Sequence, residues 1–324
     1  MSAATGAKRA LVTGGAGFIG HHLAARLLAH GWAVRVLDDL SSGRRENVER
    51  AGREAELCVG DIRDASLLQR CLDGVDVVFH QAAVASVPRS VADPVGTSSV
   101  NVEGTLAVLE ASRRAGVRRV VLASSSAVYG DDPAMPKVET QPVRLLSPYA
   151  LHKYTDERMA RLYAELYGLE TVCLRYFNVY GPRQDPESDY AAVIPLFVSA
   201  ALQGKAVRIH GDGEQTRDFV YVGDVVEANR LAAVAPGVSG EVFNVAAGST
   251  ISVNALAQTI GECVGIELEA VHEDERPGDV RDSWADVGKI ARGLGFEAQT
   301  RLADGLARTV EAHREGRGHQ GEME

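Results

Sequence analysis

Tyr149 and Lys153 are the residues whose type and spacing first suggest chemistry. Ser147, just before them, suits a helix N-cap, and Pro148 suits the first turn of that helix. A separation of four residues places the phenol and the ammonium on one face of a helix. A neighbouring cation favours the phenolate over the phenol, so Tyr149 could accept the proton of a hydroxyl that is being oxidised. Because the same spacing is common on ordinary protein surfaces, the rest of the chain must decide.

A glycine-rich turn near the N-terminus is typical of dinucleotide binding. Residues 9–13 (RALVT) predict a buried strand, which leads into Gly14, Gly17 and Gly20 and then an apolar-periodic helix. Gly14 permits the tight turn, Gly17 lets the backbone approach a pyrophosphate, and Gly20 allows the helix to pack on the strand. The pyrophosphate is expected at the N-terminus of that helix.

Asp38 indicates which dinucleotide is bound. It ends the predicted strand 33–37, at the distance from the glycine turn where a carboxylate accepts hydrogen bonds from the adenosine ribose. A carboxylate there would repel a 2′-phosphate, so the sequence predicts NAD rather than NADP.

Six expected strands alternate with helices, which predicts an α/β fold with a parallel, doubly wound Rossmann sheet. They cover residues 9–13, 33–37, 57–61, 75–81, 119–123 and 171–176. Ligands bind outside the carboxyl ends of such strands, where the glycine turn, Asp38, Ala82, Ser125 and Asn178 fall. We expect residues 1–180 to form the NAD-binding domain, with return segments near 213–248. Residues 181–324 should mainly form a smaller, interwoven substrate lobe.

Composition argues against several classes of partner. The chain has 324 residues and a net charge of −10, without a block of Lys and Arg interleaved with aromatic residues, so no nucleic acid is expected. No apolar run approaches the roughly twenty residues that span a bilayer, and MSAATGAKR does not resemble a signal peptide. The four cysteines are far apart and form no Cys/His cluster, which predicts reduced thiols, no metal and a cytoplasmic location.

Six motifs in order resemble the extended short-chain dehydrogenase/reductase family, specifically its nucleotide-sugar epimerases and dehydratases. They are TGGAGFIG (13–20), SSSAVYG (124–130), YALHK (149–153), RYFNVYGPRQ (175–184), RDFVYV (217–222) and RPGDVRDS (276–283). The resemblance covers roughly residues 8 to 312. It implies bound NAD, a UDP-sugar substrate and a Ser/Thr-Tyr-Lys triad.

Roles follow from this resemblance, residue by residue. Ser125 would bond the sugar O4, Tyr149 would take the O4 proton, and Lys153 would hold the nicotinamide ribose. The implied cofactor contacts are Gly14, Gly17, Phe18, Ile19, Gly20, Asp38, Asp61, Ile62, Ala82, Ala83, Asn101, Ser124, Tyr149, Lys153 and Tyr176. The implied substrate contacts are Ser125, Asn178, Val193, His210, Arg217, Arg276 and Ser283. Asn178 and the two arginines would meet the diphosphate, and His210 would stack on the uracil.

The residues after Ser125 select among the reactions of the family. Related 4,6-dehydratases carry an Asp-Glu pair where this chain has Ser126 and Ala127, and related UDP-glucuronate decarboxylases usually keep the glutamate. Alanine cannot abstract a proton, so 4-epimerisation through a 4-keto sugar is favoured. Ser283 is small where related epimerases for plain hexoses carry tyrosine, which leaves room for an N-acetyl group. The expected substrates are therefore UDP-GlcNAc/UDP-GalNAc, UDP-Glc/UDP-Gal, or both.

The sequence leaves several alternative functions open. Arg89 or Arg183 could meet the carboxylate of UDP-glucuronate in a 4-epimerase of that sugar. A dehydratase, a decarboxylase and a 4-keto-sugar reductase are further alternatives, and a non-catalytic NAD-binding regulator is one of a different class.

A homodimer is also expected. Family members pair the helices that correspond to residues 97–115 and 149–167 into a four-helix bundle between subunits. In this chain both helices carry apolar residues on more than one face: Leu106, Val108, Leu109, Leu151, Met159, Leu162 and Leu166.

Overall fold

The computed structural model describes residues 7–186, 192–274 and 280–320. Its centre is a seven-stranded sheet in the order β11-β6-β5-β4-β1-β2-β3, with every neighbouring pair parallel. The strands are β1 (Arg9–Thr13), β2 (Ala33–Asp38), β3 (Glu56–Val59), β4 (Val77–His80), β5 (Arg119–Ser125), β6 (Glu170–Tyr176) and β11 (Glu241–Val245). The predicted doubly wound α/β fold is confirmed, with β11 as a seventh strand beyond the six expected.

The central strands have mainly apolar residues in their middle parts because both faces of the sheet are covered. Along β1, Val12 packs into one core and Leu11 into the other, so successive side chains serve opposite faces. The first core lies under α1 (Phe18–Ala29), α9 (Val222–Ala232) and α11 (Gly288–Leu294). The second lies under α3 (Ala65–Cys71), α6 (Gly104–Ala115) and α7 (Pro148–Tyr167). This arrangement points all seven carboxyl ends to one edge of the sheet.

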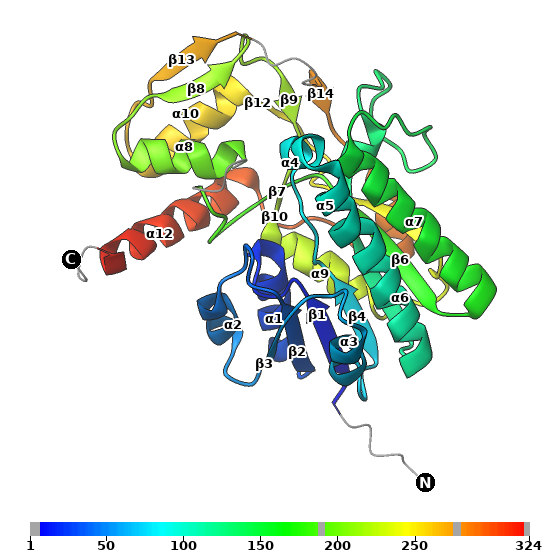
Figure 1. Ribbon diagram of the computed structural model, residues 1–324. Coiled ribbons are helices and arrows are strands. Elements are labelled where there is room, and N and C mark those ends of the chain that lie inside the picture. The colour runs from blue at the N-terminus through cyan, green and yellow to red at the C-terminus, as the bar shows by residue number, and fades with distance from the viewer. Residues whose placement is uncertain (1–6, 187–191, 275–279, 321–324) are drawn as a thin grey trace.

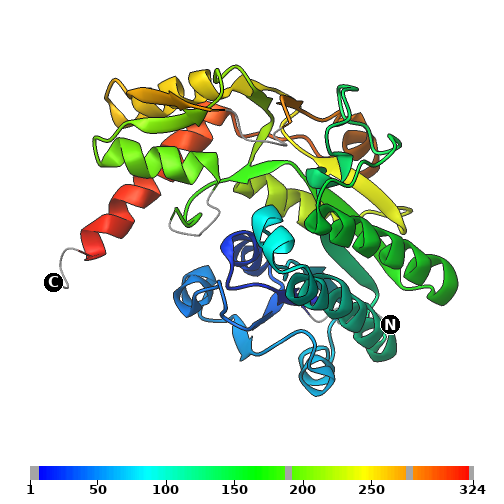
Figure 2. The same cartoon turned by 45° about the horizontal axis from the view of Figure 1, so that its top comes forward.

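A second lobe stands over that edge (Figure 1). Its helices α8 (Val193–Leu202), α10 (Val253–Val264) and α12 (Leu302–Gln320) share a third core. Its small sheets pair β8 (Val207–His210) with β13 (Ala270–Glu273), and join β9 (Thr216–Arg217) to β12 (Ile251–Ser252) and β14 (Asp282–Ser283). Figure 2 shows the second lobe and the domain of the seven-stranded sheet from another direction. The division of the chain near residue 180 stays a prediction.

The remaining elements lie between or beside the layers. They are α2 (Arg45–Ala51), α4 (Val87–Ala92), α5 (Pro94–Ser98), a π-helical turn η1 (Ser99–Glu103), a 3₁₀ turn η2 (Ser126–Tyr129), and the paired strands β7 (Asn178–Tyr180) and β10 (Phe219–Tyr221). No helix in the described parts of the chain is both long and apolar enough to cross a membrane.

Helix α7 begins and ends where the sequence indicates. The Ser147 side chain accepts a hydrogen bond from the Ala150 N–H, Pro148 is the first helical residue, and Gly168 follows the last at φ +70°. By contrast, the long helix expected over residues 97–115 is interrupted. It starts at Pro94, and the π turn at Ser99–Glu103 divides α5 from α6. Such a turn often marks a functional position, and here it contains Asn101.

Candidate active site

At Gly14 and Gly20 the turn after β1 is packed too closely for a residue with a Cβ. A Cβ at Gly14 would lie 2.7 Å from the backbone N and Cα of Ala82, which follows β4. A Cβ at Gly20 would lie 2.1 Å from the Gly14 carbonyl oxygen. The absence of a Cβ at these two positions lets the turn, the start of α1 and the end of β4 pack directly against one another. The N-terminus of α1 is thereby left facing the carboxyl edge of the sheet, with Phe18 and Ile19 in its first turn.

Gly14 and Gly31 provide a matched pair of substitutions. Both have a left-handed φ, +67° and +75°, but around Gly31 no atom lies within 4 Å of an added Cβ. We expect Gly31→Ala to cost about 1–2 kcal/mol of unfolding free energy, from its backbone conformation alone. Gly14→Ala should cost about 1–3 kcal/mol more, because Ala82 must also move. Urea denaturation measures both values, and equal losses would refute the close-packed turn.

Asp38 holds the loop that follows β2. Its carboxylate accepts hydrogen bonds from the Ala16 N–H at 2.9 Å and from the Leu40 N–H at 2.8 Å. The side chain is buried, and burial raises the pKa of this carboxyl although the two N–H groups oppose the change. The structure therefore places a carboxylate beside the glycine turn, at the end of the neighbouring strand.

Lys153 is fixed beneath the end of β5, whereas Tyr149 is more accessible. The Lys153 Nζ donates to the Ala123 carbonyl at 3.0 Å, and the residue is only 3% exposed. Tyr149, one turn earlier, is half-buried, and its backbone N–H donates to the Ser90 hydroxyl oxygen at 3.0 Å. Ser90, on α4, thus supplies an acceptor for the first turn of α7. Tyr149 and Lys153 thus lie one turn apart on α7, with the Lys153 ammonium held in place by the end of β5.

The two serines that end β5 differ in environment. Ser124 is buried and donates its hydroxyl hydrogen to Glu157 at 2.5 Å. Ser125 is half-buried, and its Oγ accepts a hydrogen bond from the Ala127 N–H. Since α7 packs against β5, Ser125 and Tyr149 reach the same edge of the sheet.

The other residues predicted to contact a cofactor mostly support this edge. Asn101 is buried and bonds both the N–H and the C=O of Val84, which fixes the loop carrying Ala82 and Ala83. Tyr176 ends β6, where its hydroxyl bonds Asn229 and Gln81. The remaining two follow β3: Asp61 pairs with Arg63, and Ile62 lies against Gly104.

The predicted substrate residues form two groups. Asn178, Arg217 and Ser283 come together around Asp218: the Asn178 side chain donates to the Asp218 carbonyl at 2.9 Å, and Arg217 is the register partner of Ser283. Val193, at the start of α8, and His210, at the end of β8, belong to the second lobe. Arg276 lies outside the described residues.

Comparison with known proteins identifies the family. The model of the NAD dependent epimerase/dehydratase family matches residues 10–246. The chain belongs to this family. A UDP-glucose 4-epimerase of Mycolicibacterium smegmatis is 45% identical over 310 residues, which cover 94% of this chain and 98% of that protein.

Solved structures agree in fold. One is the UDP-N-acetylglucosamine 4-epimerase from Methanobrevibacter ruminantium, with 39% identity, a TM-score of 0.92 and coverage of 96% of this chain and 99% of that one. Another is the UDP-glucose 4-epimerase from Thermotoga maritima, with 41% identity, a TM-score of 0.90 and coverage of 95% and 99%. Relatives at 34% and 35% identity are named a UDP-N-acetyl-alpha-D-glucosaminuronate decarboxylase and a dTDP-glucose 4,6-dehydratase.

The geometry of this family member fits NAD. The turn at Gly14 and Gly20 leaves no room for a Cβ, the N-terminus of α1 faces the ligand edge, and Asp38 ends β2 beside them. Small residues, Ala82 and Ala83, follow β4. The described residues contain no group of three or more His, Cys, Asp and Glu side chains placed to hold a metal ion.

Two buried residues behind the site of this epimerase/dehydratase were missed in the sequence. Glu157 accepts from Arg175 Nε and from a terminal nitrogen of the same guanidinium, each at 2.8 Å, besides the bond from Ser124. The Arg175 guanidinium also lies 4.8 Å from the ring centroid of Tyr129. Two signals were available: Glu157 comes four residues after Lys153, and Arg175 directly follows the apolar run 172–174 of strand β6.

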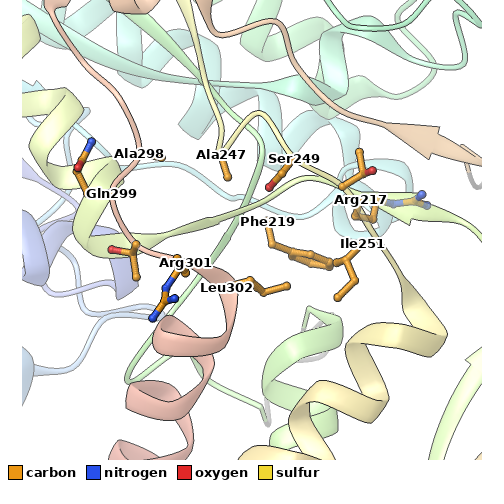
Figure 3. A pocket seen from close by; sticks show the side chains of 11 residues that line it. Arg217, Phe219, Ala247, Ser249, Ile251, Ala298, Gln299, Arg301 and Leu302 are labelled. Carbon is orange, nitrogen blue, oxygen red and sulfur yellow. The ribbon is translucent and has the colours of Figure 1, made fainter.

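A cavity of about 220 Å³ borders Arg217 on its other side. Figure 3 shows Phe219, Ile251 and Leu302 gathered at its centre, with the Arg217 guanidinium directed away from them. That guanidinium donates to the carbonyl oxygens of Thr216 and Arg281. The cavity is therefore lined by the aliphatic part of the Arg217 side chain, and no residue of β5 lines it.

Proposed function

We propose that the protein is an NAD-dependent 4-epimerase of UDP-hexoses. The observation that carries the proposal is the arrangement at the end of β5. There Lys153 is fixed by the Ala123 carbonyl and Tyr149 lies one turn away, and the turn η2 begins with Ser126 and Ala127, which carry no carboxylate. Such a site can exchange a proton with a hydroxyl, but it lacks the acid and base that a dehydratase would need there.

Each side chain has a stated task in this proposal. Ser125 donates a hydrogen bond to the sugar O4, and Tyr149, as phenolate, takes the O4 proton. Lys153 favours that phenolate and holds the nicotinamide ribose. When bound, NAD accepts a hydride from C4 and returns it. The 4-keto sugar turns over between the two transfers, and Tyr149 then gives the proton back.

The nucleotide end of the substrate is assigned to the second lobe. We place the diphosphate near Asn178, Arg217 and Arg276, because guanidinium groups suit phosphate geometry. The uracil would lie at His210 and Val193. Ser283, the register partner of Arg217, would border the C2 substituent of the sugar, and its small size supports N-acetylated substrates. Asp38, the glycine turn, Asn101, Ser124 and Tyr176 would serve the NAD side.

A panel of UDP-sugars tests the function. We would incubate the purified enzyme, without added cofactor, with UDP-Glc, UDP-Gal, UDP-GlcNAc, UDP-GalNAc and UDP-glucuronate, and follow the anomeric protons by NMR. The expected product is the C4 epimer of the added sugar, with no net release of NADH. Loss of water or CO₂, or a need for added NADH, would overturn the proposal, and epimerisation of UDP-glucuronate alone would change the substrate.

We also propose a homodimer through α6 and α7, which lie side by side in Figure 1. Val108 and Leu109 are buried in the protomer core, but Leu106, Leu151, Leu162 and Leu166 are 44–66% exposed. Exposed leucines on adjacent helices support a helix-to-helix interface. Light scattering should give twice the 34.5 kDa of one chain, and a monomeric mass would refute the dimer.

A further inference from the structure

Asp156 is a buried carboxyl beside the ammonium of Lys153. It lies on the inner face of α7, is 2% exposed, and its Oδ2 is 3.6 Å from the Lys153 Nζ. Neither carboxyl oxygen has a hydrogen-bond partner within 3.5 Å among the described residues, although the nearby Thr105 hydroxyl, on α6, helps to lower the pKa of this carboxyl. Removing a carboxylate from water without a partner is very unfavourable, so the charged form of Asp156 depends on the neighbouring Lys153 ammonium.

The ammonium of Lys153 is thus held from two elements. The β5 carbonyl of Ala123 accepts its hydrogen bond at 3.0 Å, and Asp156, on α7 itself, lies within ion-pair distance. We propose, on the basis of the proposed function, that Asp156 is a positioning residue of this active site. It fixes the Lys153 ammonium and, through its own charge, sets how strongly that ammonium favours the phenolate of Tyr149.

The spacing along α7 supports this role. Tyr149, Lys153 and Asp156 are related as i, i+4 and i+7, so all three lie on one face of the helix. Asp156 is about 10 Å from Tyr149 along the axis. The phenol therefore experiences a near cation and a more distant anion. At that distance a unit charge in a protein interior shifts the pKa of another group by about one unit. A charged Asp156 therefore offsets part of the effect of Lys153 on Tyr149.

Asp156 changes charge in the range where an enzyme works. Burial raises its pKa to about 7, although Lys153 opposes the shift. The other charged or titratable groups around the pair come from β4, from β6 and from α7 itself. Burial lowers the pKa of His80, on β4, to about 3, and it also lowers the pKa of His152, on α7. Burial raises the pKa of the Cys173 thiol, on β6, and Glu157 is paired with Arg175.

The first test compares wild-type holoenzyme with Asp156→Asn, using the UDP-sugar that is turned over. The amide is neutral at every pH, so the phenolate should be favoured more strongly. In the pH profile of kcat, the midpoint on the acid side (the acid limb) should then move to lower pH by about half to one unit. The matched control is Glu165→Gln, at an exposed position of the same helix, which should leave the limb in place. A purely structural role for Asp156 would lower stability without moving the limb, and that result would overturn the proposal.

The second test needs no turnover, so it distinguishes this proposal from a failure of the proposed function. Aspartate labelled with ¹³C at Cγ reports the ionisation of Asp156 in the NAD-bound protein, with Asp156→Asn serving to assign the signal by its loss. If Asp156→Asn does not fold, Asp156→Glu keeps a carboxyl at this position but carries no aspartate label, so it assigns the signal by its loss. Replacing Lys153 with methionine should raise the Asp156 titration midpoint by about one unit or more, because the stabilising cation is gone. An unchanged midpoint would overturn the proposal, whatever the sugar panel shows.

Discussion

Replacing Tyr149 with phenylalanine should lower kcat for epimerisation by about 10³-fold, within the range that one general acid–base group contributes. The substitution removes only the phenolic oxygen, which is the proposed acceptor of the O4 proton. Lys153 keeps its bond to the Ala123 carbonyl, and the glycine turn is untouched. NAD content should therefore stay at the wild-type level. Steady-state turnover and the absorbance of released cofactor measure the two quantities separately.

Tyr167→Phe is the matched control for this experiment. Tyr167 ends the same helix and is 54% exposed, far along α7 from Tyr149. Its loss of a hydroxyl should leave kcat and NAD content unchanged. If Tyr149→Phe kept more than about a tenth of the wild-type kcat, another group would have to take the proton and the proposed role of Tyr149 would be wrong.

The fold was accessible from the sequence because its signals are local. Apolar strands alternate with periodic helices, and Gly14, Gly17 and Gly20 follow a strand and open a helix, as a Rossmann turn requires. The place of β11 was less accessible. Its apolar residues predict a strand near the sheet, but its position beside β6 depends on a pairing between residues about seventy apart in the chain. The π turn at Asn101 was missed because helical periodicity does not reveal one extra residue.

The site was predictable only in its outer layer. Tyr149, Lys153 and Ser125 could be predicted from sequence motifs. The residues that hold them in place are recognised by their burial, which the sequence does not show. Asp156 and Glu157 look like the solvent-facing acids of an ordinary helix, yet both are at most 3% exposed. The packing of α7 against β5, β6 and α6 takes them out of water.

Arg175→Ala should destabilise the fold strongly, because it leaves Glu157 buried without its cation. The side chains of the pair are 4% and 3% exposed and are joined by two hydrogen bonds. Removing one partner of such a pair costs about 3–5 kcal/mol. The free energy of unfolding in guanidinium chloride, with NAD matched between samples, measures the loss. The control is Arg161→Ala, which breaks the exposed pair with Glu165 on the same helix and should change little.

A double variant decides whether the orphaned charge is the cause. In the Arg175→Ala background, Glu157→Gln replaces the buried carboxylate with a neutral amide that can still accept the hydrogen bond from Ser124. If the penalty arises from the unpaired charge, the double variant should be more stable than Arg175→Ala alone, so the two substitutions are not additive. If the double variant is equally or less stable, the loss comes instead from the contact of Arg175 with Tyr129 and the space it vacates. The pair would then be a packing feature rather than the electrostatic support of Ser124 at the end of β5.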